Sequence, residues 1–228
     1  MPAGTVPPPR LTGRDVHVWE ASLQTSPSTL DELARTLSRD ERTRADRFVA
    51  ERDRRRFIVS RGLLRTILSG YLSATAGAIE FAYGAHGKPG VAGGVTPLCF
   101  NVSHSAETVL YAVALGREVG IDLEYIRPDI AIEEIAAHVF PPDETRALRA
   151  IDADQRARAF FRLWTRREAY LKARGHGFAA VPPDVEAAPA SWCRLVDLSV
   201  ASDFAAALAV EGHDWRLERL TWPSGPAT

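Results

Sequence analysis

The hydrophobic and polar positions repeat with two different periods, and each period marks a different part of the chain. Residues 16–23 alternate as a β-strand does, because successive side chains of a strand point to opposite faces. Residues 38–72 carry apolar stripes at helical spacing instead. Ser38 and Glu41 form a capping-box pattern at the start of this segment. We therefore predict a strand followed by a long helical region, which a break can interrupt.

Short strands and two further helices are predicted in the rest of the chain. Pro141 and Pro142 favour a helix that starts at about Asp143, because proline suits the first helical turn. Another helix is predicted over residues 155–174 and ends at the glycines that follow it. The predicted strands cover residues 79–83, 98–103, 108–115, 119–123, 192–200, 204–210 and 215–220.

The order strand, helices, strands occurs about once in each half of the chain, with the change near Gly116. This order is typical of an α+β fold. We predict two similar α+β subdomains related by a pseudo-twofold axis, formed by residues 1–115 and 116–228. Residues 1–13 hold four prolines and are expected to be a flexible tail. Ligands often bind in the cleft between two such units.

Composition narrows the class of protein. Hydrophobic residues make up 46% of the 228 residues and charged residues 25%, which is ordinary for a globular chain. The formal net charge of −1 argues against a general nucleic-acid binder. No apolar run approaches the roughly 20 residues of a membrane-spanning helix, and no signal peptide is evident. Cys99 and Cys193 have no metal-ligand spacing. We expect a cytoplasmic enzyme or binding protein.

Lysine is rare in this chain. Of 28 basic residues only Lys88 and Lys172 are lysines. Either the two escaped a bias toward arginine, or these positions need a compact ammonium that a planar guanidinium cannot replace. Lys88 lies in a Gly-Lys-Pro turn at residues 87–89, where a solvated lysine is the simpler interpretation. Both lysines lie in motifs.

Two acidic motifs suit a divalent cation. Asp122 and Glu124 lie two residues apart on a predicted strand and so share one face. Carboxylate oxygens are ligands of Mg²⁺, although an acidic edge exposed to solvent is the commoner use of such a pair. On the later helix, Trp164, Glu168 and Lys172 recur every four residues on one face. Glu168 then supplies a third metal ligand and Lys172 a phosphate contact, or the two form a surface ion pair.

Polar and basic side chains suited to an anion occur in the first half. The run Asn-Val-Ser-His-Ser at residues 101–105 leads from a strand into a polar turn, where Asn101, Ser103 and His104 can donate to phosphate, or asparagine and serine can cap the turn. Ser103 with His104 also allows a hydrolase, but no Gly-x-Ser-x-Gly elbow surrounds the serine. Residues 35–65 hold eleven arginines against five acids, which fits a solvated face or a polyanionic ligand.

Together these motifs resemble the surfactin-type (Sfp-type) 4′-phosphopantetheinyl transferase family. The resemblance rests on Gly-Lys-Pro at 87–89, Asn-Val-Ser-His-Ser at 101–105, Gly-Ile-Asp-Leu-Glu at 120–124 and the Trp164–Lys172 helix motif, in the family's order. The family usually has lysine where this chain has Arg167, which keeps the charge. The resemblance implies two α+β subdomains with coenzyme A bound in the cleft between them.

The resemblance also implies roles for single residues. Asp122, Glu124 and Glu168 are the implied Mg²⁺ ligands, with Mn²⁺ as an alternative ion. The implied contacts with coenzyme A come from Arg56, Arg61, Lys88, Ser103, His104 and Lys172. The implied catalytic residues are Glu168 as general base, with Lys172 and His104 sharing the negative charge of the phosphates.

The implied reaction transfers the 4′-phosphopantetheine arm of coenzyme A to a serine of an apo acyl or peptidyl carrier protein and releases 3′,5′-ADP. Carrier domains of fatty acid, polyketide or non-ribosomal peptide synthesis are all candidates. One chain is expected to suffice as a monomer. Two alternatives stay open at this point: a non-catalytic coenzyme A-binding regulator and a metal-dependent phosphodiester hydrolase.

Overall fold

The first strand and the helices over residues 39–71 follow the predicted periodicity. A computed structural model of the chain describes residues 8–94, 96–175 and 189–223. Strand β1 (Asp15–Ser22) is buried along most of its length. Ser38 caps the next helical region with the full capping box that the sequence predicts. The helices of this half are α1 (Pro27–Thr36), α2 (Arg39–Ala45), α3 (Glu51–Tyr71) and the short 3-10 helix η1 (Ala76–Ala78).

A four-stranded sheet forms the centre of the first half. Its strand order is β4-β5-β1-β9. The six inner residues of β5 are buried, as expected for a strand covered on both faces. The other strands of the sheet are β4 (Leu98–Ser105), β5 (Thr108–Leu115) and β9 (Arg216–Thr221), and a separate hairpin pairs β2 (Phe81–Tyr83) with β3 (Pro89–Val91).

The second half contains a smaller antiparallel sheet with the order β6-β8-β7 and a long helix, α6, packed on it. Gly175 ends α6 in the left-handed conformation, as its place after the predicted helix indicates. The elements are β6 (Val119–Tyr125), α4 (Ile132–Val139), α5 (Pro142–Arg149), α6 (Ala153–Arg174), α7 (Pro189–Trp192), β7 (Cys193–Asp197) and β8 (Phe204–Glu211).

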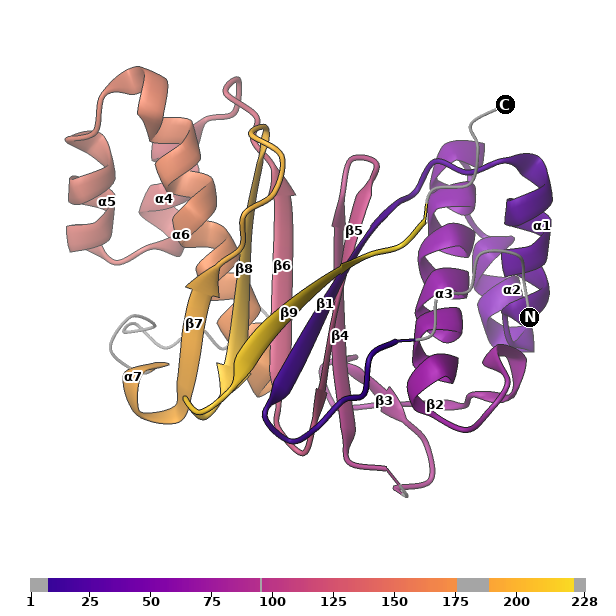
Figure 1. The fold of residues 1–228 in the computed structure, drawn as a ribbon. Coiled ribbons are helices and arrows are strands. Elements are labelled where there is room, and N and C mark those ends of the chain that lie inside the picture. The colour runs from indigo at the N-terminus through magenta and orange to yellow at the C-terminus, as the bar shows by residue number, and fades with distance from the viewer. Residues whose placement is uncertain (1–7, 95, 176–188, 224–228) are drawn as a thin grey trace.

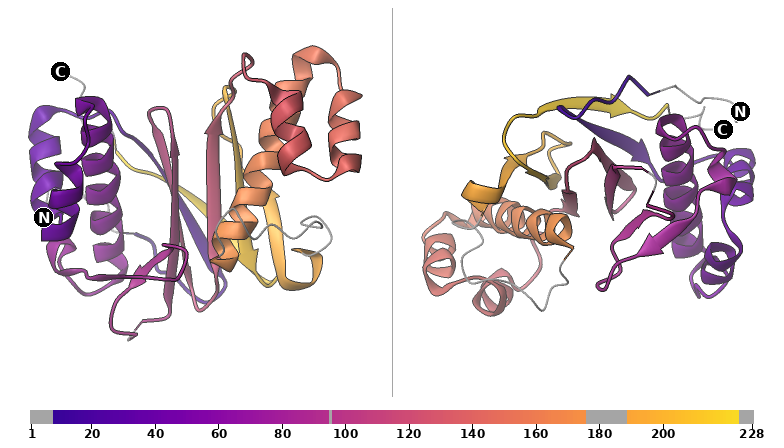
Figure 2. Two further views of the ribbon diagram at one scale, coloured as in Figure 1. Left: turned by 180° about the vertical axis from the view of Figure 1, so that it is seen from behind. Right: turned by 90° about the horizontal axis from the view of Figure 1, so that it is seen from below.

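The elements stack in layers (Figures 1 and 2). The α3 helix covers one face of the first sheet, through a core that includes Trp19, Leu64 and Phe100. The second sheet covers the opposite face, where residues such as Val18 and Leu208 pack together. Helix α6 then covers the outer face of the second sheet. The two sheets therefore lie between two layers of helices.

The observed α+β architecture with two sheets agrees with the predicted fold class. The similarity of the two halves about a pseudo-twofold axis stays a prediction, as does the division into residues 1–115 and 116–228. Strand β9 crosses this division, because it pairs in parallel with β1 at the edge of the first sheet (Figure 1). Residues 1–7 of the predicted tail lie outside the described residues, while Leu11 packs against the first core.

In the part of the chain that the structure describes, five elements lack a counterpart in the sequence prediction. These are α1, η1, α4, α7 and β3. Helix α1 does carry a local signal: the Ser26 side chain accepts a hydrogen bond from the Thr29 backbone, and Pro27 occupies its first turn. Helix α4 has no side-chain cap, and β3 is three residues long. The missing cap of α4 and the short length of β3 explain why periodicity alone does not reveal these two elements.

Candidate active site at the seam between the two sheets

Two edge strands, β4 and β6, face each other where the two sheets meet. They do not belong to the same sheet, so the backbone N–H groups of β6 on this side need other acceptors. Side chains of β4 provide them. The accepting atoms are Asn101 Oδ1 for Ile121 N at 2.9 Å, Ser103 Oγ for Leu123 N at 3.2 Å, and Ser105 Oγ for Tyr125 N at 2.9 Å. We call these three contacts the side-chain ladder.

We call the interface between β4 and β6 the seam. The side-chain ladder places the first predicted carboxylate, Asp122, at this seam. Asp122 is only 3% exposed. Its Oδ1 accepts hydrogen bonds from Ser103 Oγ at 2.9 Å and from Lys172 Nζ at 2.5 Å. Its Oδ2 is buried and has no hydrogen-bond partner among the described residues. A buried carboxylate oxygen without a partner carries a desolvation penalty that a bound cation would remove.

The two other predicted carboxylates lie near Asp122. Burial raises the pKa of the half-buried Glu124, and the negative charge of Asp122 raises it further. Burial also raises the pKa of Glu168, again with Asp122 as the next cause, while the ammonium of Lys172 opposes the shift. The three acidic groups on the strand and the helix therefore lie close enough to affect one another's ionisation.

A glycine allows α6 to approach β6 closely enough for this arrangement. A Cβ atom built on Gly120 would lie 2.1 Å from Ala169 O and 2.3 Å from Ala173 N, both backbone atoms of α6. Glu168 and Lys172 belong to the same stretch of that helix. The glycine of the Gly-Ile-Asp-Leu-Glu motif therefore sets the spacing between the two elements that carry the acidic groups and the lysine.

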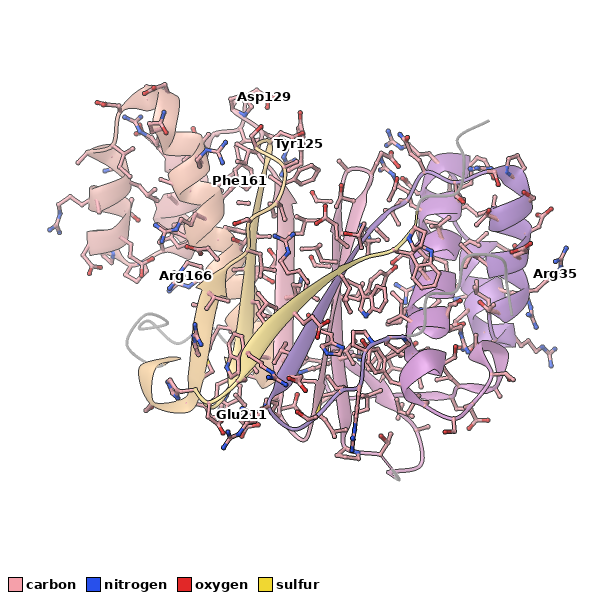
Figure 3. The ribbon with its side chains drawn as sticks, in the orientation of Figure 1. Arg35, Tyr125, Asp129, Phe161, Arg166 and Glu211 are labelled. Carbon is pink, nitrogen blue, oxygen red and sulfur yellow. The ribbon has the colours of Figure 1, made fainter. Side chains whose placement is uncertain are left out.

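Lys88 lies at the opposite end of β6 from Tyr125. Its Nζ donates to Glu118 Oε2 at 2.6 Å and to the backbone oxygens of Val119 and Ala173, each at 3.0 Å. Figure 3 shows Tyr125 at the upper end of β6 and Glu211 at the lower end of β8. Lys88 lines a pocket of about 710 Å³ at this lower end, together with residues of β3, β4 and the end of α6.

His104 faces a second pocket, because neighbouring residues of a strand point in opposite directions. This pocket of about 400 Å³ lies between β4 and α3 and includes Arg56 and Arg61. Arg61 Nη1 is buried and has no hydrogen-bond partner within the described ranges, although Arg61 Nε lies 3.4 Å from Glu41. Desolvation lowers the pKa of His104, and the positive charges of Lys172 and Arg56 lower it further.

The donor set suits a hard cation, but the ligands are not gathered into a closed cage. In the part of the chain that the structure describes, no group of three or more His, Cys, Asp or Glu side chains is positioned to hold a metal ion. Lys172 Nζ already lies against Asp122 Oδ1. The unpartnered Oδ2 of Asp122 and the carboxylates of Glu124 and Glu168 nevertheless have the oxygen chemistry that Mg²⁺ requires.

Comparisons with known proteins identify the family. A family model described as "4′-phosphopantetheinyl transferase superfamily" matches residues 118–215, and one described as "4′-phosphopantetheinyl transferase, N-terminal" matches residues 19–115. The 4′-phosphopantetheinyl transferase HetI of Nostoc sp. is 42% identical over 224 residues, which cover 92% of this chain and 94% of HetI. The chain belongs to the 4′-phosphopantetheinyl transferase superfamily. It is a 4′-phosphopantetheinyl transferase, as the sequence motifs predict.

More distant relatives of this transferase carry the same description. The 4′-phosphopantetheinyl transferase AcpT of Salmonella typhi is 39% identical over 126 residues, covering 54% of this chain and 65% of AcpT. A 4′-phosphopantetheinyl transferase of Bacillus subtilis is 29% identical over 149 residues, covering 65% of each chain. Enzymes of this family generally use coenzyme A and Mg²⁺ and act on carrier proteins.

The structure of the transferase groups the predicted site residues into three places. Asp122, Ser103 and Lys172 form direct contacts at the seam, with Glu124 and Glu168 beside them. Arg56, Arg61 and His104 line the pocket beside α3, and Lys88 lies toward the other end of β6. The individual roles of these residues stay predictions.

Two features of the transferase site go beyond the sequence prediction. Arg167, which replaces the usual lysine, is buried away from the seam, where it lies 3.3 Å from Glu144 and over the ring of Phe140. Asn101 and Ser105 hydrogen-bond to β6 and do not cap a polar turn as the sequence allows, because β4 continues to Ser105. The regular spacing of Asn101, Ser103 and Ser105 is the signal that identifies the side-chain ladder, since alternate residues of a strand share one side.

Within the described residues, no helix is both long and apolar enough to cross a lipid bilayer.

Proposed function

We propose that this transferase binds coenzyme A along the seam and transfers its phosphopantetheine arm to the serine hydroxyl of an apo carrier protein, with Asp122, Glu124 and Glu168 holding Mg²⁺. The observation that carries the metal assignment is the buried Oδ2 of Asp122, which lacks a partner although Oδ1 has two. A bound Mg²⁺ would neutralise the diphosphate and help to align it for in-line attack.

The protein groups around the metal ligands provide the remaining chemistry. Lys172 is 28% exposed, so its ammonium can reach both Asp122 and a phosphate oxygen at the seam. Glu168 is the proposed general base that accepts the proton of the carrier serine. Burial and the charge of Asp122 raise the pKa of its carboxyl, and a bound Mg²⁺ would oppose that shift.

The pocket beside α3 is the proposed site for the 3′-phosphate of coenzyme A. Arg56, Arg61 and His104 line it, and the unpartnered Nη1 of Arg61 can donate to a phosphate oxygen. Ser103 and Lys88 are proposed to contact the phosphates from β4 and from the turn before β3. In the ligand-free chain Lys88 binds Glu118, so contact with a phosphate requires exchange of that partner.

The proposed partners are coenzyme A and an apo acyl or peptidyl carrier domain. A single chain carries every residue assigned above, so we propose that the monomer is active. Since the comparisons identify a transferase, catalysis is the expected outcome. A non-catalytic regulator that only binds coenzyme A and a hydrolase that cleaves it without a carrier are the outcomes against which the experiment discriminates.

The test is incubation of the protein with coenzyme A, Mg²⁺ and a panel of apo carrier domains, followed by intact-mass measurement. We expect a carrier to gain the mass of one phosphopantetheine arm. Asp122→Asn should slow the transfer by roughly 10²–10³-fold, the scale for losing one group that stabilises transition-state charge. Asp129→Asn is the matched control, because Asp129 lies exposed beyond the end of β6 (Figure 3). Full activity of Asp122→Asn would contradict the proposed role of Asp122.

A further inference from the structure

Two rungs of the side-chain ladder repeat the same hydrogen-bond pattern. Ser103 Oγ accepts from the N–H of Leu123 and donates to the carboxylate of the preceding residue, Asp122, at 2.9 Å. Ser105 Oγ accepts from the N–H of Tyr125 and donates to the carboxylate of the preceding residue, Glu124, at 3.2 Å. Each serine of β4 thus connects a backbone group of β6 with one of the two acidic side chains on that strand.

The chemistry of the partners fixes the direction of the Ser105 hydrogen bonds. A backbone N–H can only donate, so Ser105 Oγ must act as the acceptor for Tyr125. An ionised carboxylate can only accept, so the single hydroxyl proton of Ser105 is directed to Glu124 Oε2. Asn101 differs, because its Oδ1 accepts from Ile121 and the residue before Ile121 is Gly120, which has no side chain.

Glu124 needs such an anchor more than Asp122 does. Asp122 is short, buried, and held by both Ser103 and Lys172. Glu124 has a longer side chain with more rotamers, lies half-buried, and experiences repulsion from the charge of Asp122. A hydrogen bond from Ser105 to Oε2 restrains the carboxylate against that repulsion and keeps it beside β4.

We propose that Ser105 is a positioning residue that sets the affinity for the divalent cation by fixing the carboxylate of Glu124. This inference rests on the proposed function, since it takes Glu124 to be a metal ligand. Ser105 itself does not need to contact the metal ion, coenzyme A or the carrier. Its effect on metal affinity should therefore disappear when Glu124 no longer carries a charge.

The experiment measures Mn²⁺ binding to the full chain in the presence of coenzyme A and without a carrier, from the loss of the free Mn²⁺ signal in electron paramagnetic resonance. Ser105→Ala should raise the dissociation constant by about tenfold, the scale of one lost hydrogen bond to a charged group. Ser105→Thr keeps a hydroxyl group and should retain an affinity near that of the unsubstituted protein. Ser69→Ala is the matched control, because the Ser69 hydroxyl binds a backbone oxygen within α3 and should leave Mn²⁺ binding unchanged.

Two further variants separate the possible results. Glu124→Gln should weaken Mn²⁺ binding, and adding Ser105→Ala to it should cause no further loss. If Glu124→Gln weakens binding while Ser105→Ala does not, the positioning role is refuted and the metal assignment stands. If Glu124→Gln leaves Mn²⁺ binding unchanged, the metal assignment of the proposed function fails first.

Should Ser105→Ala fold poorly in circular dichroism, Ser105→Cys keeps the volume with a weak donor, and unchanged affinity there would also refute the role.

Discussion

At the residue scale, the ionised carboxylate of Glu168 that the proposed reaction requires lowers the stability of the folded protein. Its carboxylate is half-buried next to Asp122, and burial followed by that charge raises its pKa. In the unfolded chain the same group ionises at its ordinary, lower pKa. The folded state therefore binds more protons than the unfolded state between these two pKa values, and stability falls as the pH rises through this interval.

Replacing Glu168 by Gln should therefore have opposite effects on stability and activity. At pH 7.5 we expect Glu168→Gln to unfold at a higher temperature than the unsubstituted protein in metal-free buffer, because the repulsion with Asp122 is removed. Transfer of the phosphopantetheine arm should be lost, since the amide cannot accept the serine proton. Differential scanning calorimetry and the intact-mass assay measure the two effects. A lower melting temperature together with full transfer would contradict both parts of this account.

At the scale of helices and strands, Gly120 allows α6 to pack closely on β6. The close approach of α6 to β6 places the helix that carries Glu168 beside the strand that carries Asp122. A Cβ at position 120 would meet backbone atoms of α6, and backbone cannot move aside as a flexible side chain can. The short distance between α6 and β6 therefore depends on the absence of a side chain at Gly120.

A Gly120→Ala substitution should push α6 away from β6. We expect a loss of about 1–3 kcal/mol in the free energy of unfolding, the usual range for overpacking a core, and a fall in transfer activity from the displaced Glu168. Gly90→Ala in β3 is the control, since a Cβ there meets no atom within 4 Å. Urea denaturation measures the stability. Equal stability of Gly120→Ala and Gly90→Ala would disprove the close packing.

Helix ends and strand pairings differ in how far the sequence alone predicts them. Local signals such as the Ser38–Glu41 capping box and Gly175 predicted helix ends, because their partners lie within a few residues. The pairing of β9 with β1 involves partners far apart in the chain, so no local pattern indicates it. For the side-chain ladder, the alternation of Asn101, Ser103 and Ser105 indicates one shared side of β4 but not the strand that this side contacts. Likewise, the motif spacing indicated acidic groups near a lysine, but it could not reveal that Lys172 contacts Asp122 directly.

At the scale of the whole molecule, a polar cluster around the buried His17 lies between α3, β1 and β9, with the exposed Glu218 at its edge. The Tyr71 hydroxyl accepts from Trp19 Nε1 at 2.8 Å and lies 2.8 Å from His17 Nδ1. Because Trp19 can only donate, the Tyr71 proton is available to His17 Nδ1, which leaves the ring proton on Nε2. That nitrogen lies 3.4 Å from Glu218 on β9. The cluster therefore joins the chain's last strand to its first half.

Protonation of this cluster should destabilise the fold. Burial lowers the pKa of His17, although Glu218 and Asp15 act in the opposite direction. The unfolded chain therefore gains a proton near pH 6.5 before the folded chain does. We expect the free energy of unfolding to decrease as the pH falls below about 6.5. His17→Gln should remove that part of the pH dependence, as measured by urea denaturation from pH 8 to pH 5. If the free energy of unfolding depends on pH in the same way for both proteins, His17 is excluded as the source of the pH dependence.

The most direct test of the account is the position of the divalent ion. A crystal structure with coenzyme A and Mn²⁺, in which the ion is located by its anomalous scattering, would reveal it. We predict one anomalous peak at the seam, within coordination distance of Asp122, Glu124 and Glu168 and next to the diphosphate, at about 2.0–2.3 Å from the carboxylate oxygens. A peak that binds the diphosphate without contact to Asp122 would contradict the proposed metal site.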